Sequence, residues 1–270
     1  MKPEELRAFY SGLAGSAPEP DWRSAHEALL AALESGVVRA AERDASGAWK
    51  ANAWVKEAIL TGFRRSDVQP FLTGAETFHD KTAYPPRVFG PSEGVRMVPG
   101  GSAVRRGAHV GRGVVVMPPA YVNVGAFIGE GTMVDSHALV GSCAQIGARV
   151  HLSAGAQIGG VLEPAGARPV VIEDEAFIGG LCGVFEGIVV RTRAVLAAGV
   201  VLTASTTLID LVHERELRGE VPEGAVVIPG SRPASGAYAA RRGIHVASAL
   251  IVKFRDARTD AATALEEALR

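Results

Sequence analysis

Aliphatic residues recur at every sixth position through the middle of the chain. The count starts at Val104, ends at Ile158, and has Val, Ile or Leu at every stop between them: Val110, Val116, Val122, Ile128, Val134, Val140, Ile146 and Leu152. If such residues fill about a quarter of positions, ten consecutive matches arise by chance about once in a million. A helix repeats every 3.6 residues and a coiled coil every seven, so neither explains a strict period of six.

This spacing predicts a triangular prism of short parallel strands. With three strands per coil, one aliphatic side chain per face points inward and stacks on its equivalent in the next coil. Glycine often follows the inward residue, as in Val110-Gly111, where it supplies backbone dihedrals that other residues resist. Known hexapeptide prisms wind left-handed. We therefore expect a mainly β protein built on a left-handed parallel β-helix.

The repeat is interrupted and then resumes. The segment 159–171 is too long for one step and predicts an ejected loop, after which the count restarts at Ile172 and runs to Leu208. The charged segment 213–220 predicts a second surface loop, and 221–227 a last partial coil.

The two flanks show no repeat. Ser24 and Glu27 have capping-box spacing, which predicts a helix that ends at Gly36, and Asn52 is a candidate cap for a second helix. The other expected elements are a hairpin over 37–42 and 48–50, an irregular connector over 66–95, a strand over 247–254 and a helix over 259–269. We expect an N-terminal helical domain and connector over 1–90, the β-helix over 91–235, and a strand and helix cap over 236–270, with the flanks covering the open ends of the prism.

Composition and charge exclude several classes of protein. The net charge of −1 gives no reason to expect a nucleic-acid partner, and no apolar run approaches the roughly 18 residues of a membrane span. The chain opens with the polar Met1-Lys2-Pro3-Glu4-Glu5, with no apolar signal core behind it. The two cysteines, Cys143 and Cys182, are too few for a disulfide framework, and we expect both to be packed, inert thiols. These features predict a cytoplasmic protein.

Longer strings in the repeat carry a more specific signal. They are Val116-Met117-Pro118, Glu130-Gly131-Thr132-Met133-Val134-Asp135, Val140-Gly141-Ser142-Cys143-Ala144-Gln145-Ile146-Gly147, and Ile158-Gly159-Gly160-Val161-Leu162-Glu163-Pro164. With Trp49 and Trp54-Val55-Lys56 in the N-terminal part, they resemble the tetrahydrodipicolinate N-succinyltransferase family almost from end to end. The resemblance implies a homotrimer with active sites between subunits. It implies transfer of a succinyl group from succinyl-CoA to the amine of ring-opened tetrahydrodipicolinate, L-2-amino-6-oxopimelate, in lysine and diaminopimelate biosynthesis.

The same resemblance points to particular residues. Asp135 and Glu186 match the family's proposed catalytic carboxylates, and Arg96 matches an arginine that holds the carboxylates of the substrate. The chemistry agrees, because an amine that attacks a thioester must pass its proton to a base. Glu186 follows the apolar Val184-Phe185, which suits a base, and Asp135 takes a place where glycine is common, so its side chain should point out of the prism. We expect Glu186 as general base and Asp135 as orienting group, or the reverse.

Two departures from the family pattern lie beside these residues. Ser136-His137 replaces the usual Thr-Trp after Asp135, and Gly180-Leu181-Cys182-Gly183 replaces a stretch with an arginine and a glutamate. We expect His137 to contact substrate. Losing an arginine would weaken recognition of a succinyl carboxylate, so an acetyl-CoA-dependent N-acetyltransferase stays an alternative, as does a non-catalytic scaffold. For coenzyme A we expect contacts from Gly199, Ser205 and Lys253.

Three histidines raise the question of a zinc site. His109, His137 and His151 are 28 and 14 residues apart, which does not match the pattern of the zinc enzymes built on this prism. We therefore expect no metal and a structural role for His151. Small-molecule substrates, rather than nucleic acid or membrane, are the expected partners.

Overall fold

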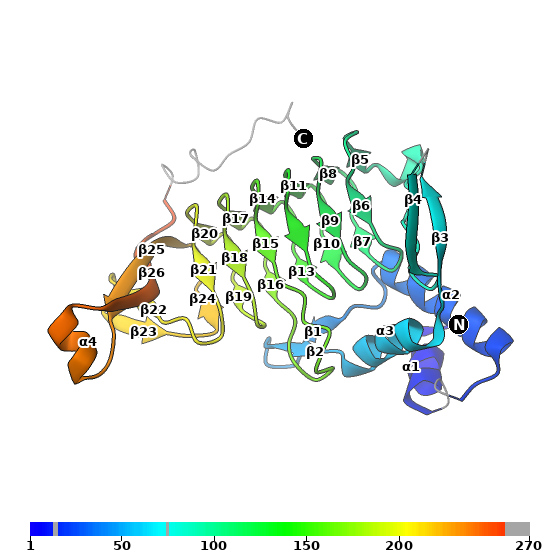
Figure 1. Ribbon diagram of the computed structural model, residues 1–270, viewed down its shortest axis with the longest axis horizontal. Helices are drawn as coiled ribbons and strands as arrows, with labels where there is room; N and C mark the ends of the chain where they lie inside the picture. Colours follow the sequence, from blue (N-terminus) through cyan, green and yellow to red (C-terminus); the bar gives the residue numbers. More distant parts are fainter. Residues whose placement is uncertain (13–15, 74–75, 257–270) are drawn as a thin grey trace.

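The computed structural model describes residues 1–12, 16–73 and 76–256, and the backbone of 91–233 winds as a parallel β-helix (Figure 1). Its three faces are here called sheets A, B and C, and each coil visits them in that order. Strands 18 residues apart pair in register, as Phe127 does with Gln145. The predicted left-handed parallel β-helix is confirmed.

The strands of the prism are short, most of them two residues long. Sheet A contains β5 (Arg96–Met97), β8 (Val115–Val116), β11 (Met133–Val134), β14 (His151–Leu152), β17 (Phe177–Ile178) and β20 (Val195–Leu196). Sheet B contains β6 (Ala103–Val104), β9 (Tyr121–Val122), β12 (Leu139–Val140), β15 (Gln157–Ile158), β18 (Gly183–Val184) and β21 (Val201–Leu202). Sheet C contains β7 (His109–Val110), β10 (Phe127–Ile128), β13 (Gln145–Ile146), β16 (Val171–Ile172), β19 (Val189–Val190) and β24 (Glu220–Val221).

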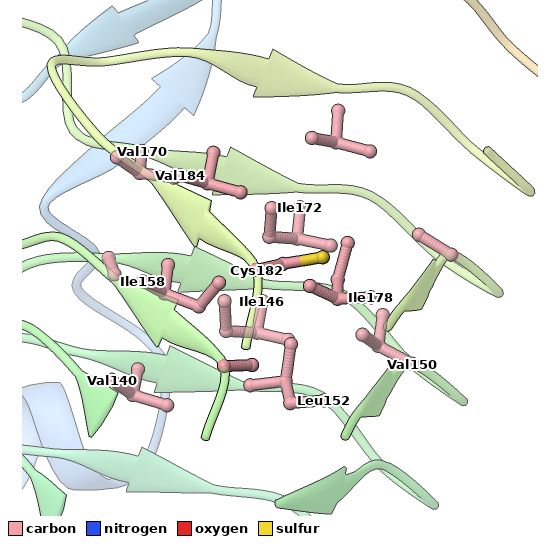
Figure 2. Close-up of a cluster of buried hydrophobic side chains, with 14 of the residues drawn as sticks. Val140, Ile146, Val150, Leu152, Ile158, Val170, Ile172, Ile178, Cys182 and Val184 are labelled. Atoms are coloured by element: carbon pink, nitrogen blue, oxygen red, sulfur yellow. The ribbon is translucent and has the colours of Figure 1, made fainter. Parts of the chain in front are cut away.

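The core of the prism is a stack of aliphatic side chains (Figure 2). The second residue of each strand points inward, so Ile128, Ile146 and Ile172 follow one another along sheet C. All three are at most 1% exposed. Burying one such side chain contributes about 1.5–3 kcal/mol, and every coil buries three, which explains why the sixfold period is kept so strictly.

The corner between sheets A and B is a column of residues with left-handed backbone. His137, Gly155, Leu181 and Gly199 have φ of 62°, 72°, 59° and 77°. Each hands its coil on to the next, because the N–H groups of Gly155, Leu181 and Gly199 donate to carbonyls of residues 136, 154 and 180. Glycine takes this conformation without strain, whereas His137 and Leu181 do so at some cost.

The C-terminal part extends sheet A beyond the prism. β25 (Ala225–Pro233) continues the sheet from β20, and β26 (His245–Phe254) lies between β25 and β22 (Leu208–Asp210). A short helix, α4 (Ala237–Arg242), joins the two long strands. The strand predicted over 247–254 is confirmed and begins two residues earlier, at His245. The helix predicted over 259–269 lies outside the described residues.

Two segments expected to be irregular form strands. Segment 213–220 was expected as a loop, but β23 (Arg215–Leu217) pairs antiparallel with β22. Segment 66–95 was expected as a connector, but β3 (Val68–Thr73) and β4 (Glu76–Lys81) form a hairpin, followed by a 3-10 turn over Pro91–Glu93. Both strand pairs are rich in polar residues, and backbone pairing rather than an apolar pattern forms them.

Three helices form the N-terminal part: α1 (Pro3–Gly12), α2 (Glu19–Glu34) and α3 (Ala53–Arg65). The two longer ones were expected, but their predicted caps are wrong. Ser24 lies inside α2, which starts at Glu19 after a proline, and Asn52 precedes α3 while its side chain donates to the Arg39 carbonyl. The predicted hairpin is confirmed as β1 (Ala41–Arg43) and β2 (Trp49–Ala51). Among the described residues, no helix is long and apolar enough to cross a membrane.

The N-terminal helices pack along the side of the prism rather than over its open end (Figure 1). Their apolar core includes Val124 and Cys143 from the corner between sheets B and C. The ammonium of Lys56, on α3, donates to the carbonyls of Pro164 and Ala167 in the ejected loop, at 3.1 and 2.6 Å. The expectation that this part caps the prism is therefore wrong for the helices, because the N-terminal part covers sheet C and fastens the loop.

Candidate active site

Asp135 begins the turn from sheet A to sheet B, directly after β11. Its N–H donates to the Leu152 carbonyl, and its carboxylate accepts a hydrogen bond from the N–H of Ser136 at 2.7 Å. The side chain is half-buried and does not enter the core, because Val134 is the inward residue. The carboxylate is thus held by its own turn at the outside of the prism.

Glu186 lies at the turn from sheet B to sheet C, directly after β18 and Phe185. Its backbone is left-handed, with φ of 53°, and its carboxylate accepts a hydrogen bond from the N–H of Ala204 at 2.9 Å. The apolar setting expected from Val184 is not found in the single chain. Val184 points into the core and Glu186 is exposed. Any shielding of Glu186 has to come from something that docks on this corner.

The two carboxylates are on opposite edges of one sheet. Asp135 precedes β12 and Glu186 follows β18, and β15 lies between these two strands in sheet B. With strands about 4.8 Å apart, the two residues differ by about 10 Å along the prism, in addition to the full width of the sheet. One chain therefore does not bring Asp135 and Glu186 together.

The remaining expected residues divide between the same two corners and sheet A. His137 and Gly199 share the column at the corner between sheets A and B, and Ser205 follows Glu186 by one coil at the corner between sheets B and C. Arg96 is exposed on β5, which β8 separates from β11, the strand that leads to Asp135. Lys253 is on β26 at the opposite end of sheet A, 3.4 Å from Asp256.

Leu181 belongs to the same column as His137. It is 76% exposed, although it is a large apolar residue, and its side chain lies against Gly155 in the preceding coil. Both departures from the family pattern therefore face one stretch of the corner that begins at Asp135. The sequence could not show this, because His137 and Leu181 are far apart along the chain.

The three histidines are in three different places. His109 stacks on Phe127 on sheet C, His151 stacks on Phe177 on sheet A, and His137 is at the corner between sheets A and B. Within residues 1–12, 16–73 and 76–256, no three His, Cys, Asp or Glu side chains are grouped as a metal ion would need.

Both cysteines are buried and poorly suited to nucleophilic chemistry. Burial raises the pKa of Cys143 to about 12, and burial also raises the pKa of Cys182 above its ordinary value. At neutral pH both are neutral thiols, packed among small residues.

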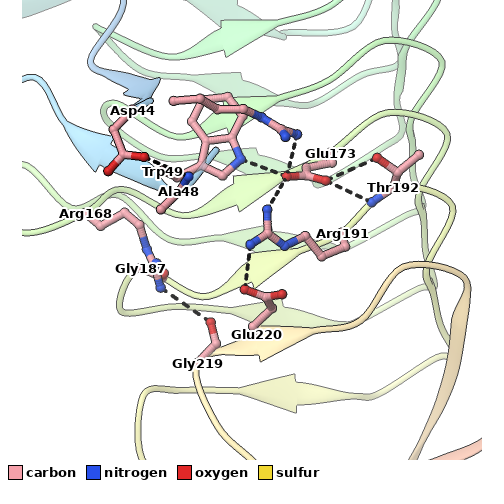
Figure 3. Close-up of polar contacts among 11 residues, drawn as sticks. Asp44, Ala48, Trp49, Arg168, Glu173, Gly187, Arg191, Thr192, Gly219 and Glu220 are labelled. Atoms are coloured by element: carbon pink, nitrogen blue, oxygen red, sulfur yellow. Dashed lines mark hydrogen bonds and ion pairs between the residues drawn. The ribbon is translucent and has the colours of Figure 1, made fainter. Parts of the chain in front are cut away.

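A buried carboxylate that the sequence analysis passed over joins the N-terminal hairpin to the prism (Figure 3). Glu173, directly after β16, accepts hydrogen bonds from Arg43, Trp49 and Arg191 at 2.8–2.9 Å, and from Thr192. Burial alone would raise the pKa of Glu173, but these hydrogen bonds and the two arginine charges hold it below its ordinary value. Its signal in the sequence was an acidic residue at the position where glycine commonly follows the inward residue.

Comparisons with known proteins identify the family. Residues 9–64 match the family described as "Tetrahydrodipicolinate N-succinyltransferase N-terminal", and residues 169–204 match "Hexapeptide repeat of succinyl-transferase". A 2,3,4,5-tetrahydropyridine-2,6-dicarboxylate N-succinyltransferase from Rhodopseudomonas palustris is 46% identical over 263 residues, which cover 94% of this chain and 92% of that one. The chain belongs to the tetrahydrodipicolinate N-succinyltransferase family.

Further tetrahydrodipicolinate N-succinyltransferases agree with this assignment. The protein of that name from Bradyrhizobium diazoefficiens is 47% identical, covering 92% of this chain and 90% of that one. A crystal structure of a putative 2,3,4,5-tetrahydropyridine-2-carboxylate N-succinyltransferase from Campylobacter jejuni has a TM-score of 0.53. It is 14% identical and covers 98% of this chain and 78% of that one, so it supports the fold alone. The family resemblance read from the sequence strings is confirmed.

Proposed function

We propose that this protein is a tetrahydrodipicolinate N-succinyltransferase of diaminopimelate and lysine biosynthesis, which takes succinyl-CoA as co-substrate. The observation that carries the proposal is the 46% identity that extends over 94% of the chain. It includes both the N-terminal part and the prism, so the function does not rest on the prism fold, which hosts several activities.

The chemistry asks for a base and a shielded cleft. The neutral amine of L-2-amino-6-oxopimelate attacks the thioester carbonyl carbon, the C–S bond then breaks, and the amine proton passes through a carboxylate to the coenzyme A thiolate. Glu186 is our general base and Asp135 the orienting group, or the reverse. Backbone N–H groups at the corners are suited to stabilise the oxyanion of the tetrahedral intermediate.

A homotrimer with sites between subunits would unite these residues. Asp135 and Glu186 lie at opposite edges of sheet B, and the N-terminal part covers sheet C. A neighbouring prism placed against sheet B could bring its Glu186 to this Asp135 and shield both. Arg96 would then hold acceptor carboxylates and His137 contact substrate, while Gly199, Ser205 and Lys253 would contact coenzyme A.

The acetyl-CoA alternative is supported by Leu181. An exposed apolar side chain occupies the corner near Asp135 where the family pattern has an arginine, and it offers no cation to a succinyl carboxylate. A scaffold without catalysis has no comparable observation in its favour.

One assay separates these possibilities. Free thiol release is followed from succinyl-CoA and from acetyl-CoA, each with tetrahydrodipicolinate as acceptor. The proposal expects succinyl-CoA to give at least tenfold the kcat/KM of acetyl-CoA. Preference for acetyl-CoA would favour the alternative donor, and no turnover with either would favour the scaffold. Retention of activity after EDTA treatment tests the expectation that no metal is needed, and cell fractionation tests the cytoplasmic location.

A further inference from the structure

A second cleft opens on another edge of the prism. It has a volume of about 610 Å³ and lies between the β1–β2 hairpin and sheet C, toward the corner between sheets C and A. Its lining includes Arg39, Phe127, Ile172 and Asp174. Asp135 and Glu186 lie at the other two corners, so this cleft is separate from the candidate active site. Its volume is within the range of small-molecule sites.

Arg39 is fixed in this cleft. Its guanidinium carbon lies 3.6 Å from the centre of the Phe127 ring, and its Nε donates to the side-chain oxygen of Gln145 at 2.9 Å. Gln145 is itself buried, and its amide donates to backbone carbonyls, including that of Cys143 at 2.9 Å. The arginine is therefore held in one orientation before any ligand arrives.

Arg39 has no carboxylate partner within the part of the chain that the structure describes. Burial lowers the pKa of Arg39 to about 10, which still leaves it charged at neutral pH. Its two terminal amino groups make no hydrogen bond to a described residue, and they are not among the buried polar atoms that lack a partner. They are therefore open to the cleft, where a carboxylate could bind both of them in the usual forked geometry.

A complementary negative charge lines the same cleft. Asp174 is exposed, and its one hydrogen bond among the described residues is from the N–H of Ala148 at 2.8 Å. Its charge raises the pKa of Arg39, but the two side chains form no ion pair. The neighbouring Glu173 is already neutralised by Arg43 and Arg191, so it does not compete for a cation.

We propose that this cleft binds a small zwitterionic amino acid, with its carboxylate on Arg39 and its ammonium beside Asp174. A simple carboxylate would leave Asp174 unanswered, and a simple amine would face Arg39. The walls formed by Trp49, Phe127 and Val171 are suited to an apolar side chain.

The test is calorimetric titration of the full-length protein without coenzyme A. The probes are L-norleucine, hexanoate, which lacks the ammonium, and pentylamine, which lacks the carboxylate. We expect saturable binding of norleucine, and at least tenfold weaker binding of the other two, because each has lost one charge-assisted contact. Equal binding of norleucine and either analogue, or no binding of norleucine, would overturn the proposal.

Variants locate the ligand. Arg39→Gln and Asp174→Asn should each weaken norleucine binding at least tenfold, and Arg64→Gln, on the exposed surface of α3, is the matched control. Asp174→Asn keeps the oxygen that accepts from Ala148, so it tests the charge even if Arg39→Gln disturbs the hairpin. Loss of binding in Arg96→Ala or Glu186→Gln, with Asp174→Asn unchanged, would put the amino acid in the acceptor site and reject this inference. The titration involves no acyl transfer, so failure of the proposed succinyltransferase activity would not affect it.

Discussion

The side chain of Leu181 lies over Gly155, its neighbour one coil back in the column at the corner between sheets A and B. A Cβ atom on Gly155 would lie 2.7 Å from Leu181 Cδ2. Leu181 is thereby directed back along the column toward His137 rather than out into solvent. The residue that departs most from the family pattern is thus held in place by the glycine beneath it.

The Leu181→Arg variant should favour the succinyl donor. An arginine at this position can pair with a succinyl carboxylate, so we expect the ratio of kcat/KM for succinyl-CoA over acetyl-CoA to rise about tenfold. Parallel thiol-release assays measure it. Leu181→Ala is the control, since it removes the apolar side chain without adding charge. An unchanged ratio in Leu181→Arg would mean that this corner does not meet the acyl group.

The Gly155→Ala variant should destabilise the prism. The alanine must keep a left-handed φ of 72° and also displace Leu181, and we expect the free energy of unfolding to fall by about 2 kcal/mol. In a Leu181→Ala background the loss should be smaller, because only the backbone strain remains. Urea unfolding of the four proteins measures the coupling. Equal losses in both backgrounds would show that the two residues do not press on each other.

Glu186→Gln and Asp135→Asn should each leave folding and assembly intact and remove most turnover. The stronger test mixes them. If every site takes Asp135 from one subunit and Glu186 from the next, randomly mixed trimers regain about a quarter of normal sites, because half of the subunits supply each intact residue. Co-expression with two affinity tags, followed by a thiol-release assay, measures this. No recovery in verified mixed trimers would place both carboxylates of a site on one chain.

Arg96→Ala should act on acceptor binding. We expect the KM for tetrahydrodipicolinate to rise at least tenfold while kcat changes by less than about twofold, because the arginine contacts carboxylates that are the same before and during the reaction. Arg96→Lys should recover part of the affinity, since it keeps the charge and loses the fork. An unchanged KM would show that Arg96 does not contact the acceptor.

Glu173 should make stability depend on pH. Its pKa is lowered in the folded protein, so its contribution is complete above the unfolded value of about 4.3 and is lost as the pH falls through the folded value. Glu173→Gln should therefore cost about 3 kcal/mol at pH 7, and the deficit should shrink below pH 4. Urea unfolding at both pH values, with the exposed Glu223→Gln as control, measures it. A deficit that is the same at both pH values would show that the charge of Glu173 is not what matters.

How far the sequence predicted this molecule depended on how local each feature is. Ile128 and Ile146 stack because of a period that is visible in any short window, so the prism could be predicted. The docking of the N-terminal part rests on contacts such as Arg43 with Glu173, 130 residues apart, which no local pattern reveals. The caps assigned to Ser24 and Asn52 failed because a proline start and a carbonyl partner competed with the expected hydrogen bonds.

The candidate site shows the same limit. Asp135 and Glu186 could be chosen by resemblance, and the repeat places each at an outer corner. That His137 and Leu181 share one column follows only once the coils are stacked. Arg39 gave no signal, because a desolvated arginine on an aromatic ring is defined by partners such as Gln145, 106 residues away.

The strict pairing of strands 18 residues apart also makes the chain a rotary counter. An insertion of six residues between Asp135 and Glu186 would turn every later coil by one third of a revolution and carry Glu186 to a different edge. An insertion of eighteen would leave its direction unchanged and move it one level along the axis. Length changes in this gene segment should therefore be tolerated in whole turns or at ejected loops, and rejected elsewhere, whatever residues they add.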